Sequence, residues 1–164
     1  MNEKIIEHQL GNIIEDFNIF CNYLCNNNEV MLTKSCELLS KKDLFNINLF
    51  MRVPKPVLEP IYQQKAYPLL DLLFNLALKG KLFIKQLNLK GRFTLKSTKK
   101  LSDYSNLNKY EQYTCLLEIY WTNIDFDYFD TFYRNSPHVK NLAYLFEEIS
   151  SKKLLLLMIR KNVK

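Results

Sequence analysis

Apolar residues recur at three- and four-residue steps over much of this chain, which is the spacing of an amphipathic helix. The first such run covers residues 5–26 and ends in three consecutive asparagines at 26–28. Asparagine tolerates left-handed backbone and competes for backbone hydrogen bonds, so this triplet predicts the end of the helix. A short strand is expected next, over residues 30–33.

A second helix is predicted to begin after Ser40. Ser40 precedes Asp43 by three residues, which is the pattern of a helix N-cap, and the apolar spacing reaches about Met51. Three prolines then fall within residues 52–61, so this stretch is expected to be an irregular connection.

A third helix is predicted over residues 68–79. Pro68 suits the first turn of a helix, and Gly80 follows the last periodic position. Nearly every side of this helix is apolar, which predicts a core position with one exposed stripe. The polar residues of that stripe are Asp71, Asn75 and Lys79.

Residues 82–89 and 92–96 read as two strands around Lys90-Gly91, which predicts a β-hairpin. Alternation puts polar residues on an outward face: Gln86, Asn88, Lys90, Arg92, Thr94 and Lys96. The predicted inward face consists of Leu87, Leu89, Phe93 and Leu95. Further helices are expected from about residue 107 to 123 and from about 137 to 161.

Helix, short strand, helix, helix and hairpin is the element order of a winged helix, a helix-turn-helix variant that carries a β-hairpin. We therefore predict a mostly helical α+β protein with a winged-helix-like core over residues 1–104. Residues 105–164 are expected to form a helical extension packed on that core. The length of 164 residues and the lack of an internal repeat or linker favour one compact unit.

Several short motifs between about residues 12 and 130 carry a resemblance to known proteins. They are Leu32-Thr33-Lys34, Leu39-Ser40-Lys41-Lys42-Asp43-Leu44, Ile47-Asn48, Tyr67-Pro68-Leu69-Leu70, Lys109-Tyr110 and Leu116-Leu117-Glu118-Ile119-Tyr120-Trp121. In these motifs the chain resembles the winged-helix-like region of uncharacterised bacterial proteins that are often associated with a plasmid ORF-three-like domain. The resemblance implies a fold and no catalytic residues, because that family has no defined activity.

Positive charge is concentrated in the middle of the sequence. Residues 52–109 hold twelve lysines and arginines against three acidic residues, a net charge of +9. Residues 1–51 carry −3 and residues 110–164 are neutral. A surplus of this kind attracts phosphate backbones or acidic protein faces.

This charge predicts a nucleic-acid-binding protein, with DNA favoured over RNA. The stripe of the third helix is poorly suited to reading bases, because Asp71 would face phosphate. The expected contacts are to the phosphate backbone and give little sequence preference. They are Gln63, Gln64, Lys65, Lys81, Lys85, Lys90, Arg92, Lys96, Lys99 and Lys100.

The alternative is a protein-binding or inhibitor module without catalytic activity, of the kind that mobile elements encode, with an acidic protein as its partner. An acidic aromatic stretch at residues 125–133 offers candidate anchors: Phe126, Tyr128, Phe129 and Tyr133. An amphipathic helix whose aromatic residues fill the core gives the same spacing, and both interpretations stay open.

No enzyme, metal or cofactor is predicted. Four cysteines and two histidines lack the spacing of a zinc site, and a calcium-like run at 125–136 lacks the required glycine and glutamate. Phosphate-binding loops and hydrolase motifs are also absent from the sequence. Without a secretory signal or an apolar run of about 20 residues, a cytoplasmic location and no membrane partner are expected.

Overall fold

The computed structural model describes residues 3–27 and 30–123, with side chains from residue 12 onward. The chain divides into two compact units, Met1–Ile124 and Asp125–Lys164. The expected final helix and the aromatic stretch at 125–133 therefore lie outside the described residues, and the following concerns the first unit.

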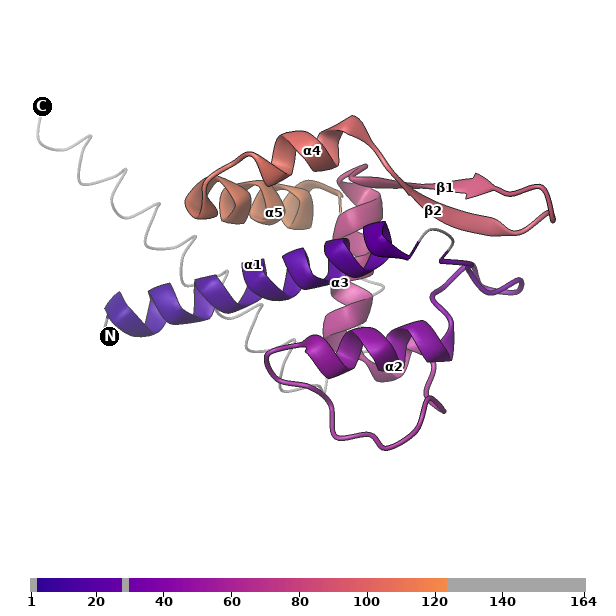
Figure 1. Ribbon diagram of the computed structural model, residues 1–164. Helices are drawn as coiled ribbons and strands as arrows, with labels where there is room; N and C mark the ends of the chain where they lie inside the picture. The colour runs from indigo at the N-terminus through magenta and orange to yellow at the C-terminus, as the bar shows by residue number, and fades with distance from the viewer. Residues whose placement is uncertain (1–2, 28–29, 124–164) are drawn as a thin grey trace, which may run out of the picture. The chain divides into compact units, whose positions relative to one another are not determined.

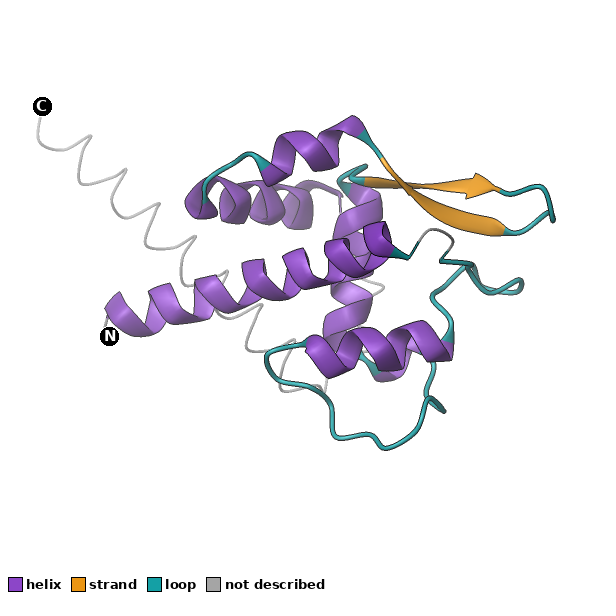
Figure 2. Cartoon of the chain, viewed as in Figure 1, coloured by secondary structure: helices purple, strands orange, loops and turns teal. Residues whose placement is uncertain are grey.

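Helices dominate the described chain, and the strands form one two-stranded antiparallel hairpin (Figures 1 and 2). In chain order the elements are α1 (Glu3–Asn26), α2 (Lys41–Phe50), the 3₁₀ turn η1 (Gln64–Ala66), α3 (Pro68–Lys79), β1 (Phe83–Leu87), β2 (Phe93–Ser97), α4 (Lys99–Ser105) and α5 (Lys109–Asn123). This order confirms the predicted α+β class, which is mostly helical with a single hairpin.

α3 is the central helix of the unit. It contacts α1, α5, η1 and β1, and in Figure 1 it crosses behind α1 between the levels of α2 and α5. Residues 70–74 of α3 are all buried, as the nearly continuous apolar sequence predicts. Phe17 and Phe20 of α1 and Ile47 of α2 are also fully buried and share this core. Burying each such side chain stabilises the fold by about 1.5–3 kcal/mol.

α2 begins and ends where the sequence predicts. The Ser40 hydroxyl accepts a hydrogen bond from the Asp43 backbone N–H at 3.1 Å and donates one to the Asp43 carboxylate at 2.5 Å. A helix-turn-helix joins its two helices by a turn of three or four residues. Here the connection to α3 is much longer, since it runs from residue 51 to residue 67.

The hairpin pairs β1 with β2 in an antiparallel register from Phe83 opposite Ser97 to Leu87 opposite Phe93. The strand expected over residues 30–33 is reduced to one bridge, between Met31 and Thr94. This bridge still holds the segment after α1 against strand β2 of the hairpin.

α4 has no counterpart in the predicted elements. Only seven residues long, it is anchored by Leu101 and Tyr104, which are both buried. α5 begins slightly later than expected, after Asn108, which exchanges hydrogen bonds with Glu111 as in a capping box. α5 packs against α1, α3 and α4, so α4 and α5 both belong to the compact unit.

Candidate nucleic-acid interface

The most unusual stretch of the chain lies between Asp71 and Asp103. It contains no carboxylate side chain and eight basic residues. We call residues 79–100 the hairpin basic segment; its basic residues are Lys79, Lys81, Lys85, Lys90, Arg92, Lys96, Lys99 and Lys100. The segment starts at the end of α3, forms the hairpin and enters α4.

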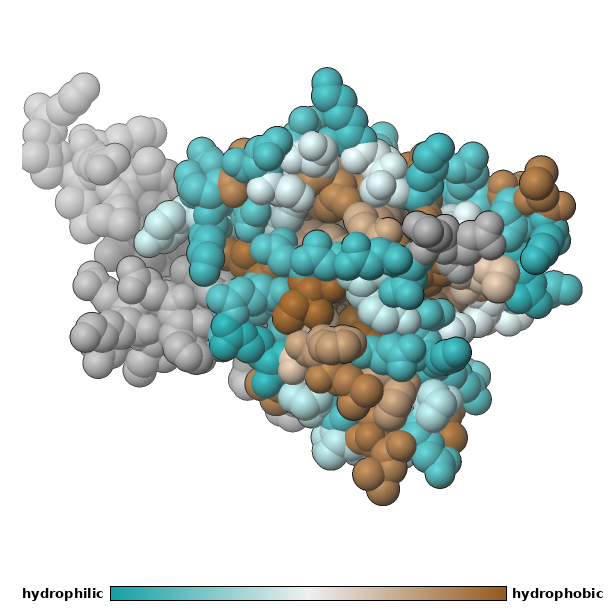
Figure 3. Space-filling model, viewed as in Figure 1, coloured by the Kyte–Doolittle hydropathy of each residue, from teal (hydrophilic) through white to brown (hydrophobic). Residues whose placement is uncertain are grey.

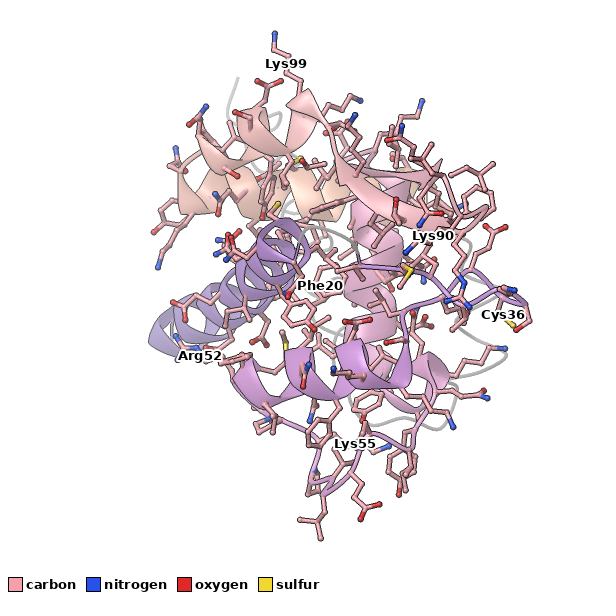
Figure 4. All side chains as sticks on the ribbon, turned by 45° about the vertical axis from the view of Figure 1, so that its right-hand side comes forward. Phe20, Cys36, Arg52, Lys55, Lys90 and Lys99 are labelled. Atoms are coloured by element: carbon pink, nitrogen blue, oxygen red, sulfur yellow. The ribbon has the colours of Figure 1, made fainter. Side chains whose placement is uncertain are left out.

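Seven of these eight side chains are exposed, the exception being Lys85. Within residues 12–27 and 30–123, none of the seven forms an ion pair with a carboxylate. Figure 4 shows Lys99 projecting away from the start of α4. The segment therefore carries seven positive charges that form no direct ion pair with a described carboxylate.

Lys85 differs because it is half-buried and its ammonium lies 2.9 Å from the Glu37 carboxylate. It faces the same side of the hairpin as Leu95, which is its partner in the register. Lys85 therefore joins the hairpin to the loop before α2, and we remove it from the predicted contact surface.

The opposite face of the hairpin carries Ile84 and Gln86, paired with Lys96 and Thr94. The predicted polar alternation is confirmed for the last three of these residues. Leu87 and Leu89 were both expected to point inward, and both are exposed instead. Leu89 lies in the turn beyond the strands, where alternation no longer applies, and Leu87 is the last residue of β1, next to that turn.

The tip of the hairpin is held by Asn88, whose side-chain oxygen accepts the backbone N–H groups of Lys90 and Arg92 at 3.0 and 2.9 Å. Gly91 between them has a φ of 68°, a left-handed conformation that glycine adopts without steric cost. This turn fixes the backbone that carries the two basic residues, while their side chains stay exposed.

Lys81 lies where glycine is normally found. The N–H of Leu82 bonds to the carbonyl of Ala77, and the N–H of Lys81 bonds to the carbonyl of Leu78, which is the Schellman pattern at a helix end. In that pattern the left-handed position is Lys81, with a φ of 57°, and Gly80 remains right-handed. A lysine in left-handed backbone costs roughly 1–2 kcal/mol, and such a cost often marks a functional position.

Position 80 needs a glycine because of close packing and not because of its backbone conformation. A Cβ atom at this position would lie 2.5 Å from Cδ1 of Ile119 and 3.0 Å from the Leu76 carbonyl oxygen. The missing side chain lets α5 approach the end of α3.

Gln64 is wrongly included among the predicted contacts. Its side chain is buried, accepts the Leu39 N–H at 3.0 Å and donates to the Asp71 carboxylate at 2.6 Å. Asp71 was expected to be exposed and is completely buried. These two polar residues satisfy each other inside the core, a pairing that helix periodicity alone does not reveal.

Gln63 and Lys65 are exposed, but they lie at the start of α3. The hairpin basic segment begins at the other end of this helix, about 17 Å away along its axis. The predicted residues therefore do not form one continuous surface. The exposed predicted residues that follow one another along the chain are those of the hairpin and the start of α4.

α3 offers no face for reading bases. Asp71 is buried, and Asn75 is half-buried with its amide donating to the Asp71 carbonyl at 2.8 Å. Only Lys79 of the predicted stripe is exposed. A recognition helix in the major groove needs several exposed polar side chains, which α3 lacks.

A pocket of about 470 Å³ opens beside the hairpin basic segment, between the end of α3, α4 and α5. Its exposed rim carries three basic and two acidic side chains: Lys79, Lys81, Lys100, Asp103 and Glu118. Cys115 lines the same pocket. Burial raises the pKa of its thiol, the Glu118 carboxylate raises that pKa further, and the Lys100 ammonium lowers it.

A second surface stands out on the opposite side of the unit, at the end of α2 and in the loop that follows. Figure 3 shows hydrophobic side chains gathered there. We call it the apolar loop surface; its exposed side chains are Leu49, Phe50, Val53, Leu58, Ile61 and Tyr62. The apolar residues between the prolines were a signal for it that sequence reasoning missed.

The loop beneath this surface is firmly anchored. Asn48 is buried and exchanges two hydrogen bonds of 2.9 Å with the backbone of Lys55. The Lys55 ammonium donates to the Ala66 carbonyl at 2.6 Å and lies 4.6 Å from the centre of the Tyr62 ring. The exposed apolar side chains therefore stand on an ordered backbone.

Among the described residues, no group of three or more His, Cys, Asp or Glu is placed to hold a metal ion. Cys21, Cys25, Cys36 and Cys115 are all free thiols. No described helix is both long enough and apolar enough to cross a membrane.

No family model, curated protein or solved structure matches this chain. The resemblance to uncharacterised bacterial winged-helix-like proteins therefore stays a prediction. The alternative anchors Phe126, Tyr128, Phe129 and Tyr133 lie outside the described residues.

Proposed function

We propose that this protein binds nucleic acid, DNA in the first instance, through contacts between the hairpin basic segment and the phosphate backbone. The observation that carries this proposal is the run from Asp71 to Asp103, which lacks any carboxylate between its ends and exposes seven basic side chains. Lys81 adds support, because the chain keeps a lysine at a backbone position that favours glycine.

The expected binding is electrostatic. Each neutralised phosphate releases counterions, so the logarithm of the affinity falls with the logarithm of salt by about 0.9 per contact on duplex DNA. Five to seven contacts give a slope of about −4.5 to −6. Because α3 presents no base-reading face, the affinity should depend little on sequence.

The test is fluorescence anisotropy of labelled DNA duplexes of mixed sequence, titrated with protein between 50 and 300 mM salt. Lys90→Glu combined with Arg92→Glu should weaken binding strongly and flatten the slope by about 2. Lys41→Glu combined with Lys42→Glu is the matched control, since these exposed lysines of α2 undergo the same change in charge. Equal losses in both double variants would mean that only net charge matters and would refute a contact surface on the hairpin.

A protein-binding role is the second candidate, and the apolar loop surface favours it. Contiguous exposed apolar side chains on an ordered backbone are typical of interaction sites. Leu58 is 97% exposed at the outer part of this loop. A partner recovered with the unaltered protein and with Lys90→Glu/Arg92→Glu, but lost with Leu58→Glu/Ile61→Glu, would support this role. Recovery of the partner with all three proteins would show that the partner does not bind the apolar loop surface.

A further inference from the structure

The pocket between α3, α4 and α5 has an apolar floor beneath its charged rim. Leu82, Tyr104 and Ile119 line it and are buried, and Leu107 lines it in a half-buried position. The Tyr104 hydroxyl is buried, and the described residues offer it no hydrogen-bond partner. The pocket thus combines an apolar lining with a buried hydroxyl that has no hydrogen-bond partner among the described residues.

The pocket and the hairpin basic segment share three basic side chains: Lys79, Lys81 and Lys100. Their ammonium groups suit a phosphate at the pocket mouth. The rim also carries the exposed carboxylates of Asp103 and Glu118, which can accept hydrogen bonds from amino groups such as those of nucleobases.

A ligand that fits these features has a phosphate, a flat ring with an apolar face, and amino groups at the ring edge. A nucleotide within a strand has all three. A base in a duplex is held in its stack and must be extruded at a cost, whereas a base in a single strand is already free. The volume of the pocket also lies within the range of small-molecule sites.

We propose that the pocket receives one unpaired base of a nucleic-acid strand whose neighbouring phosphates lie on the hairpin basic segment. This inference rests on the proposed function and narrows it to single strands or to duplexes with an unpaired nucleotide. Lys81 and Lys100 bind the phosphates beside the base, and the face of the base packs against the apolar floor.

The principal test compares three labelled probes of equal length with the unaltered protein: a mixed-sequence single strand, the same strand with all its bases removed, and the duplex. The abasic strand keeps every phosphate, so a purely electrostatic contact binds it as well as the intact strand. We expect it to bind about tenfold more weakly, because it lacks the stacking contribution of one base. The duplex should likewise bind more weakly than the intact strand at matched salt.

The outcomes separate the two proposals. If no probe binds at 50 mM salt, the proposed function fails and the pocket inference fails with it. If all probes bind but the abasic and intact strands bind equally, backbone binding stands and the base pocket is refuted. If a free mononucleotide binds as tightly as the intact strand, the base-pocket proposal is also refuted, because the neighbouring phosphates of the strand then contribute nothing to binding.

Two further measurements place the base in this pocket. Leu107→Trp fills the pocket and should reduce binding of the intact strand to the level of the abasic strand, whereas Val53→Trp adds the same side chain at the exposed loop after α2 and should change nothing. In a Cys25→Ser/Cys36→Ser background, the intact strand should protect Cys115 from alkylation at least severalfold more than the abasic strand. Equal protection by the two strands would place the base elsewhere.

Discussion

The side-chain amide of Gln64 donates a hydrogen bond of 2.6 Å to the carboxylate of Asp71, with both side chains inside the core. The amide oxygen of Gln64 also accepts the N–H of Leu39, which directly precedes the N-cap of α2. One side chain therefore fastens the start of α2 to the first turn of α3.

Replacing Gln64 by alanine should lower the free energy of unfolding by about 2–3 kcal/mol, because the substitution removes one hydrogen bond to a buried carboxylate and one to a buried N–H. Urea unfolding followed by circular dichroism measures this loss. Gln63→Ala is the matched control, since Gln63 is exposed and should cost less than about 0.5 kcal/mol. Similar losses in both variants would contradict the structural role assigned to Gln64.

The close packing of α5 against the end of α3 gives a second prediction about stability. Gly80→Ala should destabilise the protein by about 1–3 kcal/mol, because the added Cβ meets Ile119 Cδ1 in a closely packed site. Ile119→Val removes that methyl group, so the double variant should recover part of the loss. Thermal unfolding of the two single variants and the double variant gives the coupling. Strictly additive effects would show that the two residues do not touch.

Burial raises the pKa of Asp16, while a hydrogen bond from the backbone N–H of Arg52 at 2.9 Å opposes that shift. The folded state then binds the proton more tightly than the unfolded state. The resulting stabilisation is fully present below the ordinary pKa of aspartate, about 3.9, and is lost as pH rises through the raised value.

Asp16→Asn keeps an oxygen that can accept the Arg52 N–H and removes the charge. The variant should therefore be more stable than the unaltered protein at pH 7, and the difference should shrink below about pH 4, where both side chains are neutral. Chemical denaturation at pH 7 and at pH 3.5 measures both values. A variant less stable at pH 7 would show that the Asp16 charge has a partner that stabilises it.

Local signals in the sequence predicted the regular elements well. The cap at Ser40, the proline at the start of α3 and the alternation of Gln86, Thr94 and Lys96 each depend on neighbours in the chain, and each appears in the structure. α4 escaped prediction because its two buried anchors, Leu101 and Tyr104, are too few to form a recognisable period.

The candidate surface was only partly predictable, because its composition depends on tertiary pairing. Exposed lysines of the hairpin follow from charge and alternation. The burial of Gln64 against Asp71 and the ion pair of Lys85 with Glu37 join residues from separate elements, and a single sequence shows neither. The pocket likewise requires α5 to pack against Gly80, a contact between distant segments.

Lys81 links stability to the proposed function. Lys81→Gly should raise the free energy of unfolding by up to about 1 kcal/mol, because glycine relieves the left-handed backbone at the end of α3. The same change removes one ammonium from the hairpin basic segment, so nucleic-acid affinity should fall and the salt slope should decrease by about 1. Lys81→Ala is the control, since it removes the charge without relieving the backbone and should weaken binding equally with no gain in stability. Chemical denaturation and anisotropy titrations of both variants test whether stability rises while nucleic-acid affinity falls. Unchanged binding in both would mean that Lys81 occupies its position for a reason other than phosphate contact.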